Sequence, residues 1–216
     1  MVAAVLFDMD GLMFDTERLA WDAWMRVGEE NGWPITGELI DRMRGVTAAY
    51  SSVLFTEALD GKVDFHDART RRVRYMETEI RANGLPVKLG LPELLTELRR
   101  RNIPAALATS SAAETAQWYL ELSGTAEFFS ARVCGAEVPN SKPAPDVFLT
   151  AADKLGIPPE RCMVLEDSPS GIQSAHAAGC LPVMVPDLSP ATPELRTLCA
   201  AVIDSLSEAI PLLDVL

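Results

Sequence analysis

The sequence reads Val2-Ala3-Ala4-Val5-Leu6-Phe7-Asp8-Met9-Asp10-Gly11, an apolar run that ends in two aspartates and a glycine. A short apolar run of this kind is typical of a buried strand. Residues two apart in an extended strand point to the same side, so we expect Asp8 and Asp10 to project together from the carboxyl end of the strand. Gly11 then allows a tight turn. The competing interpretation is an ordinary polar strand end with a turn at Asp-Gly.

The rest of the chain predicts a parallel sheet built around this strand. Further short apolar runs lie at residues 103–108, 131–134, 162–165, 181–185 and 201–203, and amphipathic stretches lie near 91–101, 112–122, 144–155 and 170–178. Glycines follow three of these stretches, as they do at helix C-termini. Strands that alternate with helices favour an α/β, Rossmann-like fold whose sheet is covered on both faces.

One long segment, residues 17–83, interrupts this alternation. Its apolar residues recur at helical spacing in four stretches, and no strand-like run appears among them. The pattern predicts a small helical bundle inserted after the first strand. We therefore expect a core domain of residues 1–15 and 86–216 and an inserted domain of residues 16–85.

Composition disfavours several classes of function. The chain of 216 residues has 31 acidic and 19 basic side chains, for a net charge of -12, which disfavours nucleic acid and anionic membranes as partners. The N-terminal apolar run is too short for a signal peptide or a membrane span. Four cysteines without a C-x-x-C pair and only two histidines disfavour a zinc site or a histidine triad. We expect a cytoplasmic protein with reduced thiols.

A second acidic pair follows another apolar run. Glu166 and Asp167 come directly after Met163-Val164-Leu165, and Ser168-Pro169 alone would fit an ordinary helix start. In one sheet the two acidic pairs would converge, and like charges packed together are costly unless a cation neutralises them. Oxygen ligands of this kind suggest Mg²⁺.

Two further motifs could bind an anion. Thr109-Ser110-Ser111 follows the run that ends at Ala108, and hydroxyls and N–H groups at a helix N-terminus can hold a phosphate. Lys142 lies beside prolines, and a fixed ammonium can neutralise a phosphoryl group. Each motif alone also fits a simpler interpretation, an N-cap and a surface lysine.

Together, in this order, the four motifs resemble those of the haloacid dehalogenase superfamily of phosphotransferases, and the resemblance spans the chain. Phe7–Gly11 is similar to the first motif, Thr109 to the second, Lys142 to the third and Glu166-Asp167 to the fourth. The stretch Ser141–Asp146, the stretch Leu165–Ser168 with Gly171, and the insert after Asp15-Thr16 resemble the beta-phosphoglucomutase branch in particular.

The resemblance implies a Mg²⁺-dependent phosphatase in which Asp8 attacks phosphorus and forms an aspartyl-phosphate, while Asp10 protonates the leaving oxygen and then activates water. Superfamily members that cleave carbon–halogen or carbon–phosphorus bonds lack the second aspartate, so Asp10 argues against both activities. The implied phosphate-binding groups are Asp8, Gly11, Thr109, Ser110 and Lys142. The implied metal ligands are Asp8, the Asp10 carbonyl and Asp167, with Glu166 as a ligand or a close neighbour.

The resemblance also implies that residues 16–85 form a mobile cap that helps to select the substrate. Arg44-Gly45-Val46-Thr47 matches the specificity loop of the family, so Arg44 and Thr47 are expected to contact substrate. The chain departs from beta-phosphoglucomutase in having Ala48 in place of an arginine and Ala20 in place of a histidine.

The sequence leaves three hypotheses about function. We expect a monomeric phosphatase of a small phosphorylated metabolite, such as a sugar phosphate, with neither nucleic acid nor membrane as partner. The second hypothesis is a phosphosugar mutase, which Ala20 and Ala48 disfavour. The third is a non-catalytic module that binds phosphorylated metabolites, which would be expected to have lost Asp8, Asp10 or Asp167.

Overall fold

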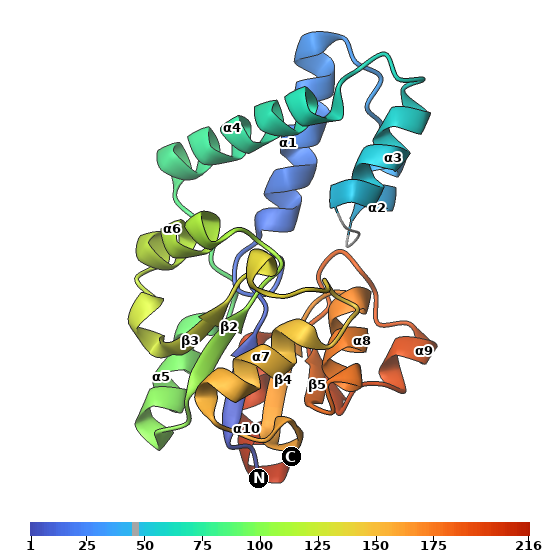
Figure 1. Cartoon of the computed structure of the whole chain (residues 1–216). Helices are drawn as coiled ribbons and strands as arrows, with labels where there is room; N and C mark the ends of the chain where they lie inside the picture. The colour runs from blue at the N-terminus through green and yellow to red at the C-terminus, as the bar shows by residue number, and fades with distance from the viewer. Residues whose placement is uncertain (45–47) are drawn as a thin grey trace. The chain divides into compact units, whose positions relative to one another are not determined.

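The computed structural model describes residues 1–44 and 48–216 and divides them into two compact units (Figure 1). The first unit comprises Met1–Asp15 and Val87–Leu216, and the second comprises Thr16–Pro86. The second unit is thus an insertion between the first strand and the rest of the first unit.

Within the first unit, six strands of the described chain form one sheet in the order β3-β2-β1-β4-β5-β6, and every pairing is parallel. The strands are β1 Ala4–Phe7, β2 Ala105–Ala108, β3 Phe129–Val133, β4 Cys162–Glu166, β5 Leu181–Met184 and β6 Ala201–Val202. This confirms the predicted α/β, Rossmann-like fold. The strand order reverses between β1 and β4, and ligands of such sheets bind beyond the carboxyl ends of the strands at that reversal.

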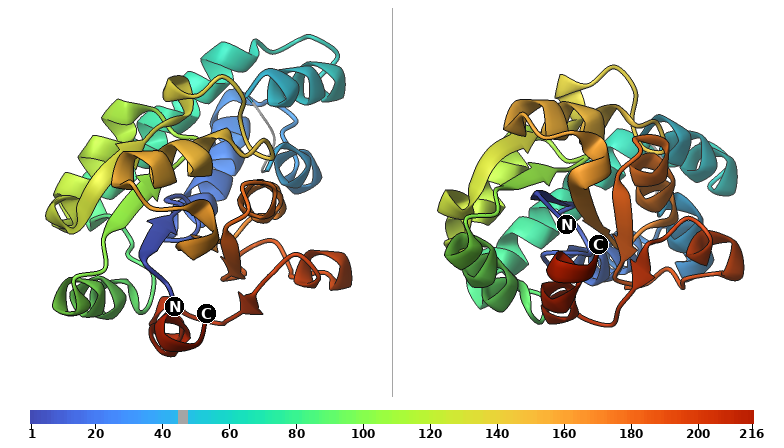
Figure 2. Two further views of the ribbon diagram at one scale, coloured as in Figure 1. Left: turned by 60° about the horizontal axis from the view of Figure 1, so that its bottom comes forward. Right: turned by 90° about the horizontal axis from the view of Figure 1, so that it is seen from below.

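The two faces of the sheet are set by alternation along each strand. Ala4 and Leu6 of β1 join one buried cluster with Ala106 and Ala108 of β2 and with residues of α7 (Asp146–Leu155) and α8 (Pro169–Ala177). The intervening residues face the opposite side, where the rings of Phe7 and Phe129 meet edge to face. Viewed from below, α7 lies on one side of the sheet and α5 (Leu91–Arg101) and α10 (Ala209–Val215) lie on the other (Figure 2).

The helices of this unit follow from apolar spacing and end signals. Helix α5 buries Leu91, Leu94, Leu95 and Leu98, the spacing of one helical face. Helices α6 (Ala113–Ser123) and α7 end at glycines in the left-handed conformation, as predicted. The remaining helical elements are α9 Pro193–Arg196 and the 3-10 turns η1 Ala126–Phe128, η2 Gly135–Glu137, η3 Pro159–Arg161 and η4 Leu206–Glu208. The sequence pattern did not predict α9 and α10.

The second unit is helical, which confirms the predicted inserted bundle. Its helices are α1 Thr16–Asn31, α2 Gly37–Met43, α3 Ala48–Ala58 and α4 Phe65–Asn83. They bury a common cluster that includes Trp24, Leu39, Phe55 and Phe65. Nowhere in the two described ranges is a helix both long and apolar enough to cross a bilayer.

The two segments that lead into and out of the insertion run together on the first unit. Phe14 and Val87 form an antiparallel bridge, and the Lys88 N–H donates to the Met13 carbonyl at 2.9 Å. The Lys88 ammonium lies 2.8 Å from Asp187, in the loop after β5, and 3.8 Å from Asp15. This short ribbon therefore fixes where the insertion leaves and rejoins the first unit.

Candidate active site

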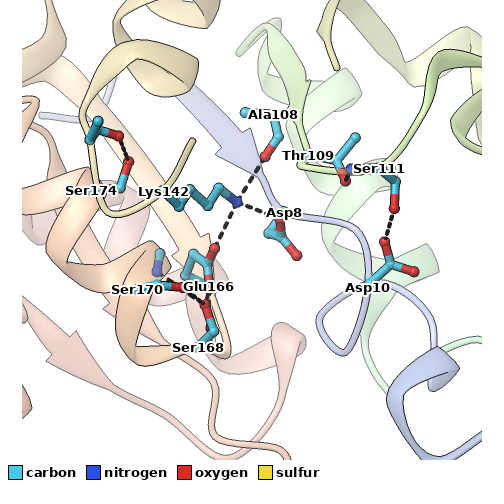
Figure 3. Close-up of polar contacts among 12 residues, drawn as sticks. Asp8, Asp10, Ala108, Thr109, Ser111, Lys142, Glu166, Ser168, Ser170 and Ser174 are labelled. Atoms are coloured by element: carbon cyan, nitrogen blue, oxygen red, sulfur yellow. Dashed lines mark hydrogen bonds and ion pairs between the residues drawn. The ribbon is translucent and has the colours of Figure 1, made fainter. Parts of the chain in front are cut away.

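The candidate site lies where the loops after β1, β2 and β4 leave the carboxyl edge of the sheet (Figure 3). Asp8 follows β1, Thr109 follows β2, and Glu166 ends β4. All three are almost completely buried. Because β1 and β4 flank the reversal of strand order, the two acidic motifs meet at the position where this fold binds ligands.

Lys142 links the acidic groups. It lies between β3 and α7, and its buried ammonium donates to Asp8 Oδ1 at 2.5 Å, Glu166 Oε1 at 2.8 Å and the Ala108 carbonyl at 3.1 Å (Figure 3). These contacts use all three donors of the ammonium. A buried charge is tolerated when it is paired and hydrogen-bonded in this way.

Both carboxylate oxygens of Glu166 accept hydrogen bonds. Its Oε1 accepts from Lys142, and its Oε2 accepts from the Ser168 N–H at 2.8 Å and the Ser168 hydroxyl at 2.9 Å. The Ser168 hydroxyl in turn accepts from the Gly171 N–H at 3.0 Å and caps α8. A Cβ on Gly171 would lie 1.7 Å from Glu166 Oε1, so only glycine leaves space for this carboxylate.

Asp167 approaches the loop after β1. A Cβ on Gly11 would lie 2.3 Å from Asp167 Oδ2, and Gly11 has a φ of +81°, so both the close approach and the turn require glycine. Carboxylate oxygens of Asp8, Glu166 and Asp167 lie within 4.8 Å of one another. Oxygen donors that converge like this suit a hard divalent cation.

The pKa of Asp8 is set by burial and by nearby charges of both signs. Burial raises the pKa of Asp8, the nearby Lys142 opposes this effect, and Glu166 and Asp10 add to it, so that the pKa rises to about 7. Burial alone would lower the pKa of Lys142, but attraction to Asp8 and Glu166 outweighs it and raises that pKa above its usual range. A cation beside Asp8 would favour its charged form.

The loop after β2 presents hydroxyls to the same edge. The Thr109 hydroxyl oxygen accepts from the Ser111 N–H at 3.0 Å, which leaves its own proton free to donate to a ligand. The Ser111 hydroxyl donates to Asp10 Oδ2 at 2.7 Å (Figure 3). The Ser110 side chain is exposed, and a Cβ on Gly135 would lie 2.5 Å from the Ser110 carbonyl oxygen, so Gly135 allows its loop to approach this one.

The two residues that the sequence suggested as substrate contacts, Arg44 and Thr47, belong to the inserted segment. Arg44 belongs to the helical unit, where its guanidinium pairs with Asp41 at 2.5 Å. Thr47 lies outside the described residues, as do Gly45 and Val46.

Three supporting residues were not among the predicted site residues. Ser168 holds Glu166, Ser111 contacts Asp10, and Gly135 supports the loop of Ser110. The N-cap pattern of Ser168-Pro169 pointed to a helix start but not to Glu166. For Gly135 the sequence offers no comparable signal.

Comparisons with known proteins agree on one family. A family model described as haloacid dehalogenase-like hydrolase matches residues 2–179. The phosphorylated carbohydrates phosphatase of Thermotoga maritima is 35% identical over 176 residues, which cover 82% of this chain and 81% of that protein. The beta-phosphoglucomutase of Bacillus subtilis is 31% identical over 195 residues, with 84% and 82% covered.

A solved structure supports the same relationship. The crystal structure of a HAD hydrolase of family IA, variant 3, from Entamoeba histolytica has a TM-score of 0.81 and 26% identity, and the match covers 96% of this chain and 95% of that one. The likeness therefore extends over both the sheet and the inserted helices.

Proposed function

The chain belongs to the haloacid dehalogenase-like hydrolase family, and from this premise we propose that it is a Mg²⁺-dependent phosphatase acting on a small phosphorylated metabolite, such as a sugar phosphate. One observation carries the proposal. Asp8 is buried at the reversal of strand order, 2.5 Å from the Lys142 ammonium and among the oxygens of Glu166 and Asp167. A nucleophilic carboxylate, a fixed cation and a set of metal ligands thus lie together.

The residues at this edge fit a divalent metal. Asp8 and Asp167 would hold it, together with the Asp10 carbonyl, while Glu166 already shares its oxygens with Lys142 and Ser168. The oxygen-only donor set favours Mg²⁺ over softer metals. When bound, the metal would screen the repulsion between the anionic nucleophile and the anionic phosphate.

Residues on the loops at the carboxyl edge of the sheet would perform the first chemical step. Asp8 attacks phosphorus and becomes an aspartyl-phosphate, which divides one difficult displacement into two. The Thr109 hydroxyl and the Ser110 N–H would donate to phosphate oxygens, and Lys142 would place positive charge beside the attacking oxygen, where charge must be spread in the transition state.

Asp10 would act as general acid in the first half of the reaction and as general base in the second. It first gives a proton to the leaving oxygen and then removes one from the water that attacks the aspartyl-phosphate. The same carboxyl can therefore serve as acid and as base without a histidine, in agreement with a sequence that has only two histidines.

Two other activities are less well supported. A phosphosugar mutase needs a second grip on the far end of its substrate, and Ala20 and Ala48 replace the residues that would provide it in beta-phosphoglucomutase. A non-catalytic binding module has no need for a nucleophile, yet Asp8, Asp10 and Asp167 are all present.

The test is phosphate release from a panel of phosphorylated sugars, nucleotides and polyols. We expect turnover with Mg²⁺, loss of turnover in EDTA, and recovery when Mg²⁺ is restored, because the acidic cluster needs a cation to accept an anionic substrate. Isothermal titration of the metal-stripped protein should also show Mg²⁺ binding that Asp167→Asn weakens. Full turnover in protein verified to be metal-free would refute the proposal.

A further inference from the structure

The Ser111 hydroxyl donates to Asp10 Oδ2 at 2.7 Å, across 101 residues of sequence. We propose that Ser111 is a positioning residue that holds the Asp10 carboxyl in the orientation from which it exchanges protons with the leaving oxygen and with water. The inference rests on the proposed phosphatase activity and assigns a task to a side chain that the mechanism so far does not use.

Ser111 is itself fixed from two sides. Its N–H donates to the Thr109 hydroxyl at 3.0 Å, and its carbonyl accepts from the Gly135 N–H at 3.2 Å. The approach of Gly135 is possible only without a side chain, since a Cβ there would lie 2.5 Å from the Ser110 carbonyl oxygen. The hydroxyl therefore projects from a backbone with little freedom to move.

The surroundings of Asp10 differ from those of Asp8. Asp8 is buried and paired with Lys142, whereas Asp10 is half-buried and is followed by Gly11 at a positive φ. In Figure 3 the Ser111–Asp10 pair lies on one side of Asp8, and Lys142 and Glu166 lie on the other. The hydroxyl that contacts Asp10 and the ammonium that pairs with Asp8 therefore approach from opposite sides of Asp8.

The reaction defines what this positioning must achieve. As the Asp8 oxygen bonds to phosphorus, the bond from phosphorus to the leaving oxygen breaks, and that oxygen takes a proton from Asp10. Water then bonds to phosphorus, the bond from phosphorus to Asp8 breaks, and the proton of the water passes to Asp10. A hydroxyl can donate to a carboxylate and accept from a carboxylic acid, so the contact between Ser111 and Asp10 can persist through both steps.

The two steps respond differently to the substrate. The leaving group of p-nitrophenyl phosphate departs without a proton, so transfer of its phosphoryl group to Asp8 makes little use of Asp10. A sugar alkoxide leaves only with a proton. Hydrolysis of the aspartyl-phosphate requires Asp10 in either case.

The experiment compares Ser111→Ala, Ser111→Thr and wild type by rapid mixing with p-nitrophenyl phosphate and with the sugar phosphate that wild type hydrolyses fastest. For Ser111→Ala we expect roughly tenfold lower steady-state turnover on both substrates, part of the full contribution of an acid–base group. With p-nitrophenyl phosphate, a burst of about one p-nitrophenolate per enzyme should form at the wild-type rate. Ser111→Thr, which keeps the hydroxyl, should restore turnover.

A matched control removes a serine hydroxyl elsewhere. Ser123 donates to the Tyr119 carbonyl at 2.8 Å on α6, and Ser123→Ala should leave both substrates unaffected. Ser111→Cys offers a second variant of similar size with a weak donor, and it should behave like Ser111→Ala. This variant keeps the inference testable if Ser111→Ala fails to fold.

Three results would overturn the inference. They are an equal loss of the p-nitrophenolate burst rate and of sugar phosphate cleavage, unchanged turnover in Ser111→Ala, and wild-type behaviour of Ser111→Cys. The proposed function fails separately, if wild type itself releases no phosphate from any substrate.

Discussion

At the scale of single residues, two glycines give the carboxylates their space. Gly11 allows Asp167 to approach the loop after β1, and Gly171 allows Glu166 to occupy the space beside the first turn of α8. The charged side chains explain what the site could do, but the absence of a Cβ at these two positions explains why the carboxylates can be so close.

We predict that Gly171→Ala impairs catalysis although alanine is the better helix former. Helix propensity alone would favour alanine by about 1 kcal/mol, but its Cβ would lie 1.7 Å from Glu166 Oε1 and would displace the carboxylate that anchors Lys142. A misplacement of this kind costs about 100-fold in turnover. Steady-state kinetics and a thermal melt would check this, with the exposed Gln173→Ala on the same helix as control. Wild-type kinetics in Gly171→Ala would contradict it.

The two aspartates of the first motif should differ on substitution. Asp8→Asn removes the nucleophile, so phosphate release should disappear. Asp10→Asn keeps the nucleophile but loses proton transfer, so turnover should fall by about 10²–10⁴, and an activated aryl phosphate, whose leaving group needs no proton, should still phosphorylate Asp8. Mass spectrometry of the acid-quenched protein would detect that adduct. If Asp8→Asn retained wild-type turnover, the nucleophile would be another residue.

Local sequence could indicate the charged residues of this site but not their supports. Asp8 and Asp10 stand out because a strand ends in both. The contact between Ser111 and Asp10 joins residues 101 positions apart, and it depends on the strand order that places β1 beside β2. No local pattern carries that information.

At the scale of elements, the side chain of one lysine joins the connecting ribbon to the loop after β5. The Lys88 ammonium lies 2.8 Å from Asp187, whose side chain is only 2% exposed, and 3.8 Å from Asp15. The lysine thus ties both connecting segments to the loop after β5. Because Asp187 is so buried, we expect this pair to contribute more to the free energy of unfolding than the exposed ion pairs of the described residues do.

We predict that Lys88→Met destabilises the folded protein. Removal of one partner from a fully buried pair costs about 3–5 kcal/mol, and since the Lys88 side chain is 23% exposed we expect about 2 kcal/mol. Denaturant unfolding would measure this. The matched control is Lys62→Met, which breaks a pair with Asp60 whose side chains are 76% and 75% exposed and should cost about 0.5 kcal/mol or less. Equal effects in the two variants would contradict the prediction.

The elements were predictable where a period or an end signal was strong. The apolar spacing of α5 and the glycines after α6 and α7 indicated those helices. The short helix α9 has only four residues, too few to show a period. The run predicted as a strand at 131–134 instead extends from Phe129 to Val133, because Ser130 separates Phe129 from the apolar run although Phe129 pairs with Ala105 of β2.

At the scale of the whole molecule, phosphatase and mutase differ in whether water or a sugar accepts the phosphoryl group. A mutase must grip a phosphate at the far end of its substrate, and a hydrogen bond to a charged group contributes about 1.5–3 kcal/mol, or about 10-fold to 100-fold in binding. Ala48 and Ala20 supply no such group. We predict that glucose 1-phosphate, where it is accepted, yields inorganic phosphate.

Phosphorus NMR of the reaction mixture, with a trace of glucose 1,6-bisphosphate as primer, would follow both products. The control is a reaction without the primer, which a phosphatase does not need. Accumulation of glucose 6-phosphate faster than free phosphate would overturn the assignment and would suggest that Arg44 binds the far phosphate in place of the missing residues.

The two edge strands of the sheet influence how copies of the protein associate in a concentrated solution. A bare strand at a margin invites a strand of another molecule to extend the sheet, which is a common route to aggregation. Here β6 at one margin has only two residues, and at the other the Lys154 ammonium donates to the main-chain carbonyl of Arg132 in β3 at 2.7 Å. Both edges are therefore protected, and we expect the chain to resist aggregation by sheet extension at high concentration.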